Sequence, residues 1–510
     1  MRPRLMFPDA DFSPAAPDTT HHDLIEDLEL HELWDAMARG DGRLHLIART
    51  ATLTPLTDPA TITHRQDVLT DCLRNTTTAR ALYDLADQAV TADRQITRVG
   101  ARNPEVLLNQ SLRALELFCG HLRRLSAFTA EHAHAFGSAA LTRLCRLIRE
   151  QLTGEYLGEL ETLLRRIDFD HGIIATAHLG EGNKSVGFRL QEPPSGKGRG
   201  SAAHRRLKRS GLSCTIRGRY EADWRALTSF RGRVLQVIAD AATESAGNVR
   251  GFFTALRDEL GFYIGCLNLA ETLTESGLPI CLPTPRPSAE RALTAQDLHE
   301  PCLALRRGGP NAGNDITADA TDLIVITGAN GGGKTTFLRS VGVAHLMMQS
   351  GMFVTAHALT ASVTGRLHTH FRREEDHTMA SGKLEEELIR MSAVADALHP
   401  GDLLLCNESF TSTNEREGST IAAEIVQALT DSGVRVLFVT HLHDFARRML
   451  TERPARSLFL LAARGENGQR PFRLTPGVPS PTAHAADLYA RIFGEPLDRP
   501  ADDRPDDRQA

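Results

Sequence analysis

The 510-residue sequence has few aromatic residues, only 5% of the chain, so aliphatic residues must supply most of its hydrophobic core. Its eight cysteines include no C-x-x-C pair, which argues against a zinc site or a disulfide framework and indicates core residues in a reducing compartment. The sequence also lacks a recognisable signal peptide and any uninterrupted apolar run long enough to cross a bilayer. We therefore expect a cytoplasmic protein with no membrane partner.

An excess of positive charge is also missing, because 58 Lys and Arg stand against 64 Asp and Glu, a net charge of −6. A nucleic-acid partner would then need a local basic patch. Residues 193–220 contain no Asp or Glu but many Lys and Arg. This pattern is typical of phosphate contact and equally typical of a solvated loop. The candidate contact residues are Lys197, Arg199, Arg205, Arg206, Lys208 and Arg209.

Apolar residues recur at helical spacing through most of the first half of the chain. Their periodicity predicts one long amphipathic helix over residues 108–125 and another over residues 141–164. Two short strand-like runs at 172–177 and 185–190 flank a Gly-Glu-Gly-Asn turn signal and predict a small hairpin. Helical spacing then resumes and continues to about residue 276.

Strands and helices alternate in the second half, as in a parallel α/β sheet. After a Pro- and Gly-rich junction at 278–312, strands are expected at 322–327, 402–406, 435–440 and 457–462. The predicted fold is thus a mainly α-helical domain with a small β-containing insert, followed by an α/β P-loop domain. The expected limits are a disordered tail at 1–20, the helical domain at 21–297 with its insert at about 168–221, the α/β domain at 298–495, and a disordered tail at 496–510.

Residues 328–335, Gly-Ala-Asn-Gly-Gly-Gly-Lys-Thr, fit the P-loop pattern G-x-x-x-x-G-K-[ST]. They lie between an apolar strand and a helix-spaced run, so their backbone N–H groups and the helix N-terminus would surround a phosphate. Lys334 would reach the β- and γ-phosphates and Thr335 would ligate magnesium. The sequence therefore predicts an ATP–Mg²⁺ site that includes Gly328, Asn330, Gly331, Gly332, Gly333, Lys334, Thr335 and Thr336.

An apolar strand ending in Asn407-Glu408 has the form of a Walker B element, with Asn407 in place of the usual Asp. Asn407 keeps an oxygen that can hold magnesium through a water but lacks the charge, so we expect slow hydrolysis. Glu408 is the predicted general base, the alternative being a surface glutamate at a strand end. His441 follows the next strand, where α/β proteins bind ligands, and is predicted to sense the γ-phosphate or position water.

Ser381 and Gly382 form a turn that opens an apolar-spaced helix. The exposed N–H groups of such a turn can bind an anion. The turn is either a phosphate site for a neighbouring subunit or a simple helix cap, and spacing alone leaves both open.

Taken in order, these motifs resemble the ATPase domain of the MutS family of DNA mismatch-repair proteins. The resemblance covers about residues 298–495, and the preceding helices are similar, more weakly, to the family's core-and-lever domain. His299-Glu300-Pro301 and Asn314-Asp315 resemble the family's entry into the domain, beside the adenine pocket. The motifs are 327–336, 351–356, 379–383, 404–413 and 438–441.

The resemblance implies an ABC-type ATPase that acts as a homodimer with composite sites. Ser381 and Gly382 would face the γ-phosphate bound by the partner, and residues 411–414 would form an interface loop. The insert at 168–221 would be a clamp for double-stranded DNA, mismatched or branched, contacted by the basic residues named above. The family's mismatch-reading N-terminal domain with its Phe-x-Glu wedge is not recognised in this chain, nor is a C-terminal nuclease-like domain.

The first functional hypothesis is therefore an ATP-dependent, DNA-binding clamp ATPase of the MutS type that acts in DNA repair. The alternative is an ATP-switched dimeric scaffold with little hydrolysis and protein partners, which Asn407 motivates. A transporter ATPase is disfavoured because Ser381-Gly382-Lys383 differs from the Ser-Gly-Gly-Gln signature of such subunits.

Overall fold

The computed structural model describes residues 1–14, 21–96, 104–166, 174–179, 185–191, 221–373, 382–462 and 471–479. The chain forms two compact units, one made of residues 1–13 and 70–264 and the other of residues 14–69 and 265–510. Two helices, α4 (Pro59–Arg74) and α10 (Glu221–Glu275), continue from one unit into the other. No helix among the described ranges is both long enough and apolar enough to cross a bilayer.

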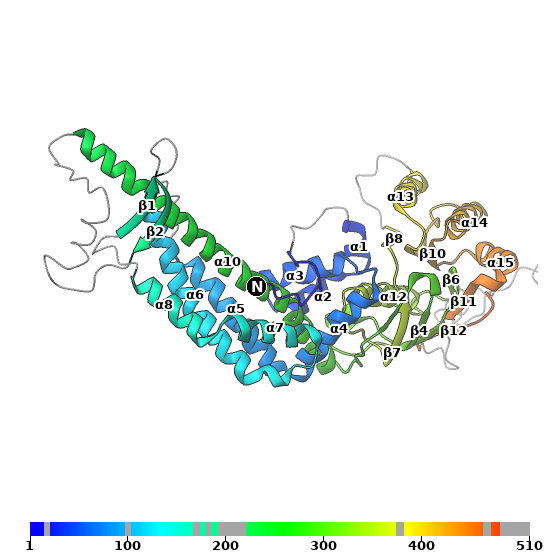
Figure 1. Ribbon diagram of the computed structural model, residues 1–510. Helices are drawn as coiled ribbons and strands as arrows, with labels where there is room; N and C mark the ends of the chain where they lie inside the picture. The colour runs from blue at the N-terminus through cyan, green and yellow to red at the C-terminus, as the bar shows by residue number, and fades with distance from the viewer. Residues whose placement is uncertain are drawn as a thin grey trace, which may run out of the picture. The chain divides into compact units, whose positions relative to one another are not determined.

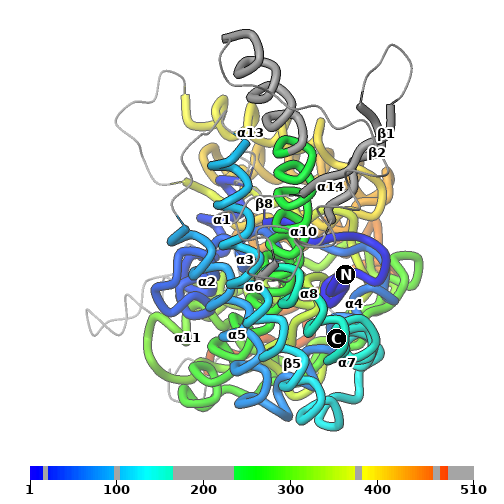
Figure 2. Tube along the Cα trace, turned by 60° about the vertical axis from the view of Figure 1, so that its left-hand side comes forward, coloured from blue at the N-terminus to red at the C-terminus, as the bar shows by residue number. Residues whose placement is uncertain are grey.

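The first unit is helical. In both views α6 runs beside α10, and Phe118 of α6 stacks on Phe253 of α10 with ring centroids 5.8 Å apart (Figures 1 and 2). A two-stranded antiparallel sheet lies between α8 and α10 in the chain. The elements are α5 (Thr76–Arg94), α6 (Pro104–His132), η2 (Ala133–Ala135), α7 (Ala139–Gln151), α8 (Gly154–Arg166), β1 (Ile174–Leu179), β2 (Ser185–Gln191) and α10 as far as residue 264.

The N-terminal segment is packed against α10 of the same unit. Leu5 and Met6 are fully buried, and their backbone N–H groups donate to the carboxylate of Glu259. Tyr263 donates its hydroxyl hydrogen to the carbonyl of Leu5 at 2.7 Å. Burial raises the pKa of Glu259 to about 7. Within the segment for which a disordered tail was expected, Leu5 and Met6 therefore have a buried partner for their backbone N–H groups.

The second unit is built on a six-stranded sheet of order β12-β11-β6-β10-β9-β8, in which only β12 is antiparallel to its neighbour. A separate four-stranded sheet has the order β3-β7-β4-β5. The strands are β3 (Thr284–Arg286), β4 (Leu293–Leu298), β5 (Asn314–Thr317), β6 (Leu323–Thr327), β7 (Ala358–Ser362), β8 (Leu367–Phe371), β9 (Leu403–Asn407), β10 (Arg435–Val439), β11 (Ser457–Ala462) and β12 (Leu474–Pro476).

Both faces of the six-stranded sheet are buried, which explains its uninterrupted apolar strands. Alternate residues such as Leu404, Cys406 and Phe438 join a core cluster with α13, α14 and α15, which Figure 1 shows together beside β8 and β10. Residues of the opposite parity, such as Leu405, face α12, where a side chain at Gly342 would meet Leu405 at 2.6 Å. The later helices and turns are α11 (Pro301–Arg307), α12 (Lys334–Gln349), α13 (Lys383–Ala397), α14 (Glu415–Asp431), α15 (His443–Glu452), η5 (Ser288–Glu290) and η6 (Pro454–Arg456).

The helices of residues 21–69 pack on the same unit. Leu56 exchanges backbone and side-chain hydrogen bonds with Gln349 at the end of α12, and Arg65 donates to the carbonyl of Ser350 at 3.0 Å. The compact units therefore do not coincide with the predicted boundary at residue 298, because this early segment buries its apolar face against α12. The helices are α1 (His22–Asp27), α2 (Leu30–Ala38), α3 (Gly42–Leu53) and most of α4.

The structure confirms a helix-rich chain with an α/β region and finds all four predicted strands of that region within two residues of their expected limits. The helix expected over 141–164 is instead two helices, because Leu152 ends α7 and α8 begins at Gly154. The junction at 278–312 is not simply a connection, since it supplies β3, β4 and α11. The six basic candidates between Lys197 and Arg209 lie outside the described residues.

Candidate functional site

The P-loop connects the carboxyl end of β6 to the N-terminus of α12. Gly328, Gly331 and Gly333 have φ values of 119°, 68° and 91°, a region that side chains disfavour. A Cβ at Gly332 would lie 2.7 Å from the Cβ of Ala462, and one at Gly328 would lie 2.9 Å from the same atom. The predicted glycines are thus required both by backbone conformation and by the close approach of β11.

Lys334 is the first residue of α12, and its residue surface is 4% exposed. Its Nζ donates to the carbonyls of Gly328 at 2.9 Å and Ala329 at 3.1 Å, and lies 3.4 Å from Nε2 of His441. Burial lowers the pKa of the Lys334 ammonium. The ammonium therefore lies at the opening of the P-loop. A bound phosphate would contact it there in place of the two carbonyls.

Thr335 and Asn407 meet where magnesium is expected in a P-loop protein. The Thr335 hydroxyl donates to Oδ1 of Asn407 at 2.9 Å, joining the start of α12 to the end of β9. Hydroxyl and amide oxygens are hard ligands of the kind that magnesium prefers, together with waters and phosphate oxygens. These residues fit the ion, although the pair brings no negative charge to it.

Glu408 directly follows β9, and its backbone has the uncommon φ of 55°. Its N–H donates to the carbonyl of Val439 at 2.9 Å, which brings the ends of β9 and β10 together. Nε2 of His441 lies 3.2 Å from Oε1 of Glu408, and a carboxylate can only accept, so the imidazole donates. This hydrogen bond is the largest cause that lowers the pKa of Glu408. The carboxylate is therefore ionised at neutral pH, as a base must be.

Arg372, which the sequence analysis did not single out, also belongs to this group. Its N–H donates to the carbonyl of Asn407 at 2.9 Å, and its Nη1 lies 4.0 Å from Oε2 of Glu408. Its guanidinium is half exposed. Arg372 follows β8, a strand that was not predicted, so only the parallel pairing of β8 with β9 reveals its place in the site.

The remaining predicted residues have mixed outcomes. Asn330 lies in the loop and Thr336 in the first turn of α12, as expected. Gly382 is the N-cap residue of α13 and makes no side-chain hydrogen bond to the helix, and Ser381 lies outside the described residues. The roles of Ser381 and Gly382 toward a second subunit therefore remain predictions.

Asn314 and Phe472 lie next to the P-loop, on the side where the adenine pocket is predicted. The Asn314 side chain donates to the carbonyl of Phe472 at 3.3 Å and accepts from the N–H of Leu474 at 2.7 Å. A Cβ at Gly333 would lie 3.2 Å from that same Phe472 carbonyl. Phe472 itself is 49% exposed and was not singled out from the sequence.

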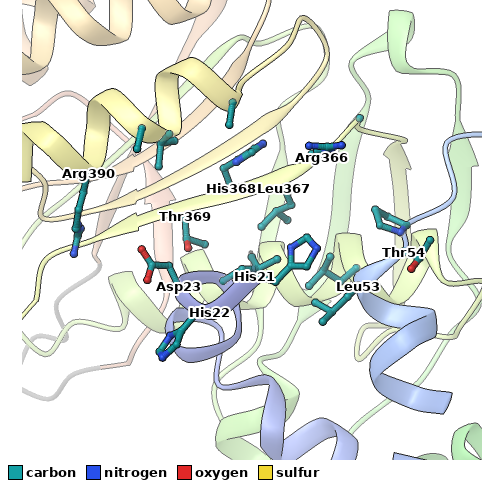
Figure 3. A pocket seen from close by; sticks show the side chains of 17 residues that line it. His21, His22, Asp23, Leu53, Thr54, Arg366, Leu367, His368, Thr369 and Arg390 are labelled. Atoms are coloured by element: carbon teal, nitrogen blue, oxygen red, sulfur yellow. The ribbon is translucent and has the colours of Figure 1, made fainter. Parts of the chain in front are cut away.

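A separate cavity of about 800 Å³ opens between α1, β8 and the second half of α13 (Figure 3). The side chains of His22, Arg366, His368 and Arg390 line it, with Asp23 the acidic residue labelled there. None of the predicted nucleotide-binding residues lines this cavity. It therefore leaves free space beside α13, away from the P-loop.

Comparison with known proteins identifies two parts of the chain. Residues 57–276 match the MutS2 N-terminal domain, and residues 324–472 match MutS domain V. The chain is 30% identical over 165 residues to the DNA mismatch repair protein MutS of Chloroflexus aurantiacus, a match that covers 31% of this chain and 17% of that protein.

Two further relatives illustrate the range of the similarity. The chain is 30% identical over 126 residues to Endonuclease MutS2 of Carboxydothermus hydrogenoformans, covering 24% of this chain and 16% of that protein. It is 27% identical over 197 residues to DNA mismatch repair protein spellchecker 1 of Drosophila melanogaster, covering 38% and 22%. The matches thus span about a fifth of each relative's length. Because domains of one family match both halves of the sequence, the resemblance to the MutS family is confirmed.

Proposed function

We propose that the chain binds ATP with magnesium at the P-loop and hydrolyses it. The observation that carries this proposal is the meeting of three strand ends at one place. The end of β6 leads to Lys334, the end of β9 provides Asn407 and Glu408, and His441 follows β10. Ligands of open α/β sheets bind at the carboxyl ends of the strands, and these four side chains have the types that phosphoryl transfer needs.

In this mechanism Lys334 exchanges its contacts with the two loop carbonyls for the β- and γ-phosphates. Thr335, and Asn407 through a water, would hold magnesium, which would supply positive charge to offset the charge that develops on the phosphates. Glu408, ionised and held by His441, orients the attacking water and accepts its proton. Arg372 lies close enough to Glu408 to steady the carboxylate, but far enough to leave it free to accept that proton.

The second part of the proposal is that ATP controls a clamp on double-stranded DNA, mismatched or branched, in a homodimer. The relatives named above are mismatch-repair and MutS2 proteins, which supports DNA as the partner. The antiparallel pair β1–β2 comes between the helices α8 and α10, and the segment that follows β2 carries the basic candidates from Lys197 to Arg209. Such an insert, carried by long helices, suits contact with phosphates.

The ATPase proposal is tested with Lys334→Ala and Glu408→Gln. We expect Lys334→Ala to lose ATP binding, because the cation is the main charge of the loop. We expect Glu408→Gln to bind ATP as the wild type does and to hydrolyse it about 10²–10⁴-fold more slowly, the usual contribution of a general base. Equal hydrolysis by the wild type and Glu408→Gln would refute the role of Glu408. Binding without any measurable turnover in the wild type would favour an ATP-switched scaffold.

A further inference from the structure

The turn that carries Glu408 is fastened to α13 by a buried carboxylate. Oε1 of Glu387, on α13, accepts a hydrogen bond from the backbone N–H of Phe410 at 2.6 Å. Glu387 is 7% exposed and Phe410 is fully buried. Phe410 has a φ of 64°, so this turn contains two non-glycine residues in the left-handed region, Glu408 and Phe410. Such a backbone persists only when its surroundings hold it, and Glu387 supplies one of the bonds that do so.

His370 of β8 provides a second connection between α13 and the same turn. Burial, helped by the charge of Arg390, lowers the pKa of His370 to about 4, so its ring is neutral at neutral pH. Its Nε2 lies 3.2 Å from the carbonyl of Glu387, which can only accept, so Nε2 carries the hydrogen. Nδ1 lies 2.7 Å from the hydroxyl oxygen of Ser409, and that hydroxyl donates to the carbonyl of His370 at 2.9 Å. The ring also stacks on Phe410, with centroids 5.9 Å apart and planes at 23°.

The turn has little freedom to move on its own. A Cβ at Gly418 of α14 would lie 2.3 Å from the carbonyl of Phe410, so α14 closes one side of it. By contrast, the second half of α13 borders the cavity of about 800 Å³ shown in Figure 3, where Arg390 points away from α13. The Arg390 side chain donates to the carbonyl of Phe371 at 2.7 Å, a second polar bond between α13 and β8. The cavity therefore gives α13 space to move. Its polar bonds to β8 and to the turn would transmit such a movement to the turn.

We propose that Glu387 is a positioning residue that couples α13 to Glu408. A displacement at the start of α13, where Gly382 caps the helix, would move the Phe410 amide and so reorient the neighbouring Glu408 carboxylate. This inference rests on the proposed homodimer and on the composite site implied by the MutS resemblance, in which a second copy's nucleotide would contact the start of α13. It names the regulation of that site: nucleotide bound by one subunit sets the catalytic base of the other through Glu387.

The test compares Glu387→Ala, Glu387→Gln and the matched control Glu385→Ala in the full-length chain. Glu385 lies on the same helix and is exposed, so Glu385→Ala removes an equal charge without touching the turn. Glu387→Gln retains an oxygen that can accept from Phe410. We expect Glu387→Ala to reduce kcat for ATP at least tenfold with its Kd for ATP changed less than twofold, because the P-loop is untouched. Glu387→Gln and Glu385→Ala should stay within threefold of the wild type.

A second measurement separates coupling from simple loss of structure. Hydrogen exchange is followed in peptides from α13 and from residues 408–413, with and without a non-hydrolysable ATP analogue. In the wild type and in Glu387→Gln, both peptides should gain protection together. In Glu387→Ala the α13 peptide should still respond while the 408–413 peptide no longer does.

The outcomes distinguish the inference from the function on which it rests. A wild type without ATP turnover or ATP-induced protection would overturn both. A wild type that turns over ATP, with Glu387→Ala matching it in kcat and in exchange, would overturn the coupling alone. An equal loss of kcat in Glu387→Ala and Glu387→Gln would also contradict it, because the acceptor oxygen would then not be what matters.

Discussion

Asn407 is the residue whose replacement tests the magnesium site most sharply. Asn407→Asp adds one negative charge to a side chain of nearly the same shape, 2.9 Å from the Thr335 hydroxyl. Two unit charges about 4 Å apart in a water-like dielectric interact by about 1 kcal/mol. A doubly charged ion therefore gains about 2 kcal/mol, which corresponds to roughly 30-fold at about 1.4 kcal/mol per factor of ten. We expect half-maximal ATPase activity at a roughly 30-fold lower magnesium concentration.

The assay is ATP turnover at saturating ATP as magnesium is varied, with magnesium-dependent ATP binding measured by calorimetry alongside it. The control is Asn109→Asp, which adds the same charge at an exposed position of α6. Its magnesium dependence should equal that of the wild type. An unchanged magnesium midpoint in Asn407→Asp would refute the assignment of Asn407 to the ion, whatever happened to kcat.

Two stability predictions follow from buried groups. Glu259, whose pKa of about 7 lies above that of an unfolded carboxyl, binds its proton more tightly in the folded state, so the free energy of unfolding should fall as pH rises from about 4.5 to 7. The fall should be on the order of 3 kcal/mol at about 1.4 kcal/mol per pKa unit, and Glu259→Gln should remove it, as measured by urea unfolding at pH 5 and pH 8. Gly342→Ala should destabilise by about 1–2 kcal/mol, because overpacking against Leu405 and Leu28 exceeds the gain in helix propensity. Both Gly342→Ala and the control Gly42→Ala are measured by thermal unfolding. Gly42 has open space around it, so Gly42→Ala should keep the wild-type melting temperature. Equal melting temperatures of the two variants would contradict the packing argument.

Local sequence signals were sufficient to predict a structural element when all of its residues lie in one continuous segment. The P-loop pattern correctly located a strand, a turn and a helix, because these elements follow one another along the chain. The proximity of Glu408 and His441 could also be expected, since both lie just beyond apolar strands and parallel strand ends meet at one edge. Their mutual hydrogen bond is a consequence of that topology.

Residues whose importance depends on distant pairing were missed. Arg372, His370 and Glu387 lie on or beside β8 and α13, and only the pairing of β8 with β9 brings them to the Glu408 turn. The alternation of apolar and polar residues over 367–371 covers only five residues, which is too short a pattern to distinguish a strand from the adjacent segments. The buried Glu387 likewise resembles its helical neighbours, the exposed Glu385 and the half-buried Glu386, because periodicity gives no sign that a backbone amide needs its carboxylate. The split of the helix expected over 141–164 was missed for a related reason, since Leu residues continue on both sides of Gly154.

The central claim is that ATP at this P-loop controls a grip on DNA. It is tested most directly by titrating salt against binding to homoduplex, mismatched and branched DNA, with and without ATP, for the wild type and Lys334→Ala. The account predicts binding that weakens steeply with salt, as phosphate contacts require, and that ATP alters in the wild type but not in Lys334→Ala. Absence of binding to every DNA at low salt, or an affinity that ATP leaves unchanged, would contradict it.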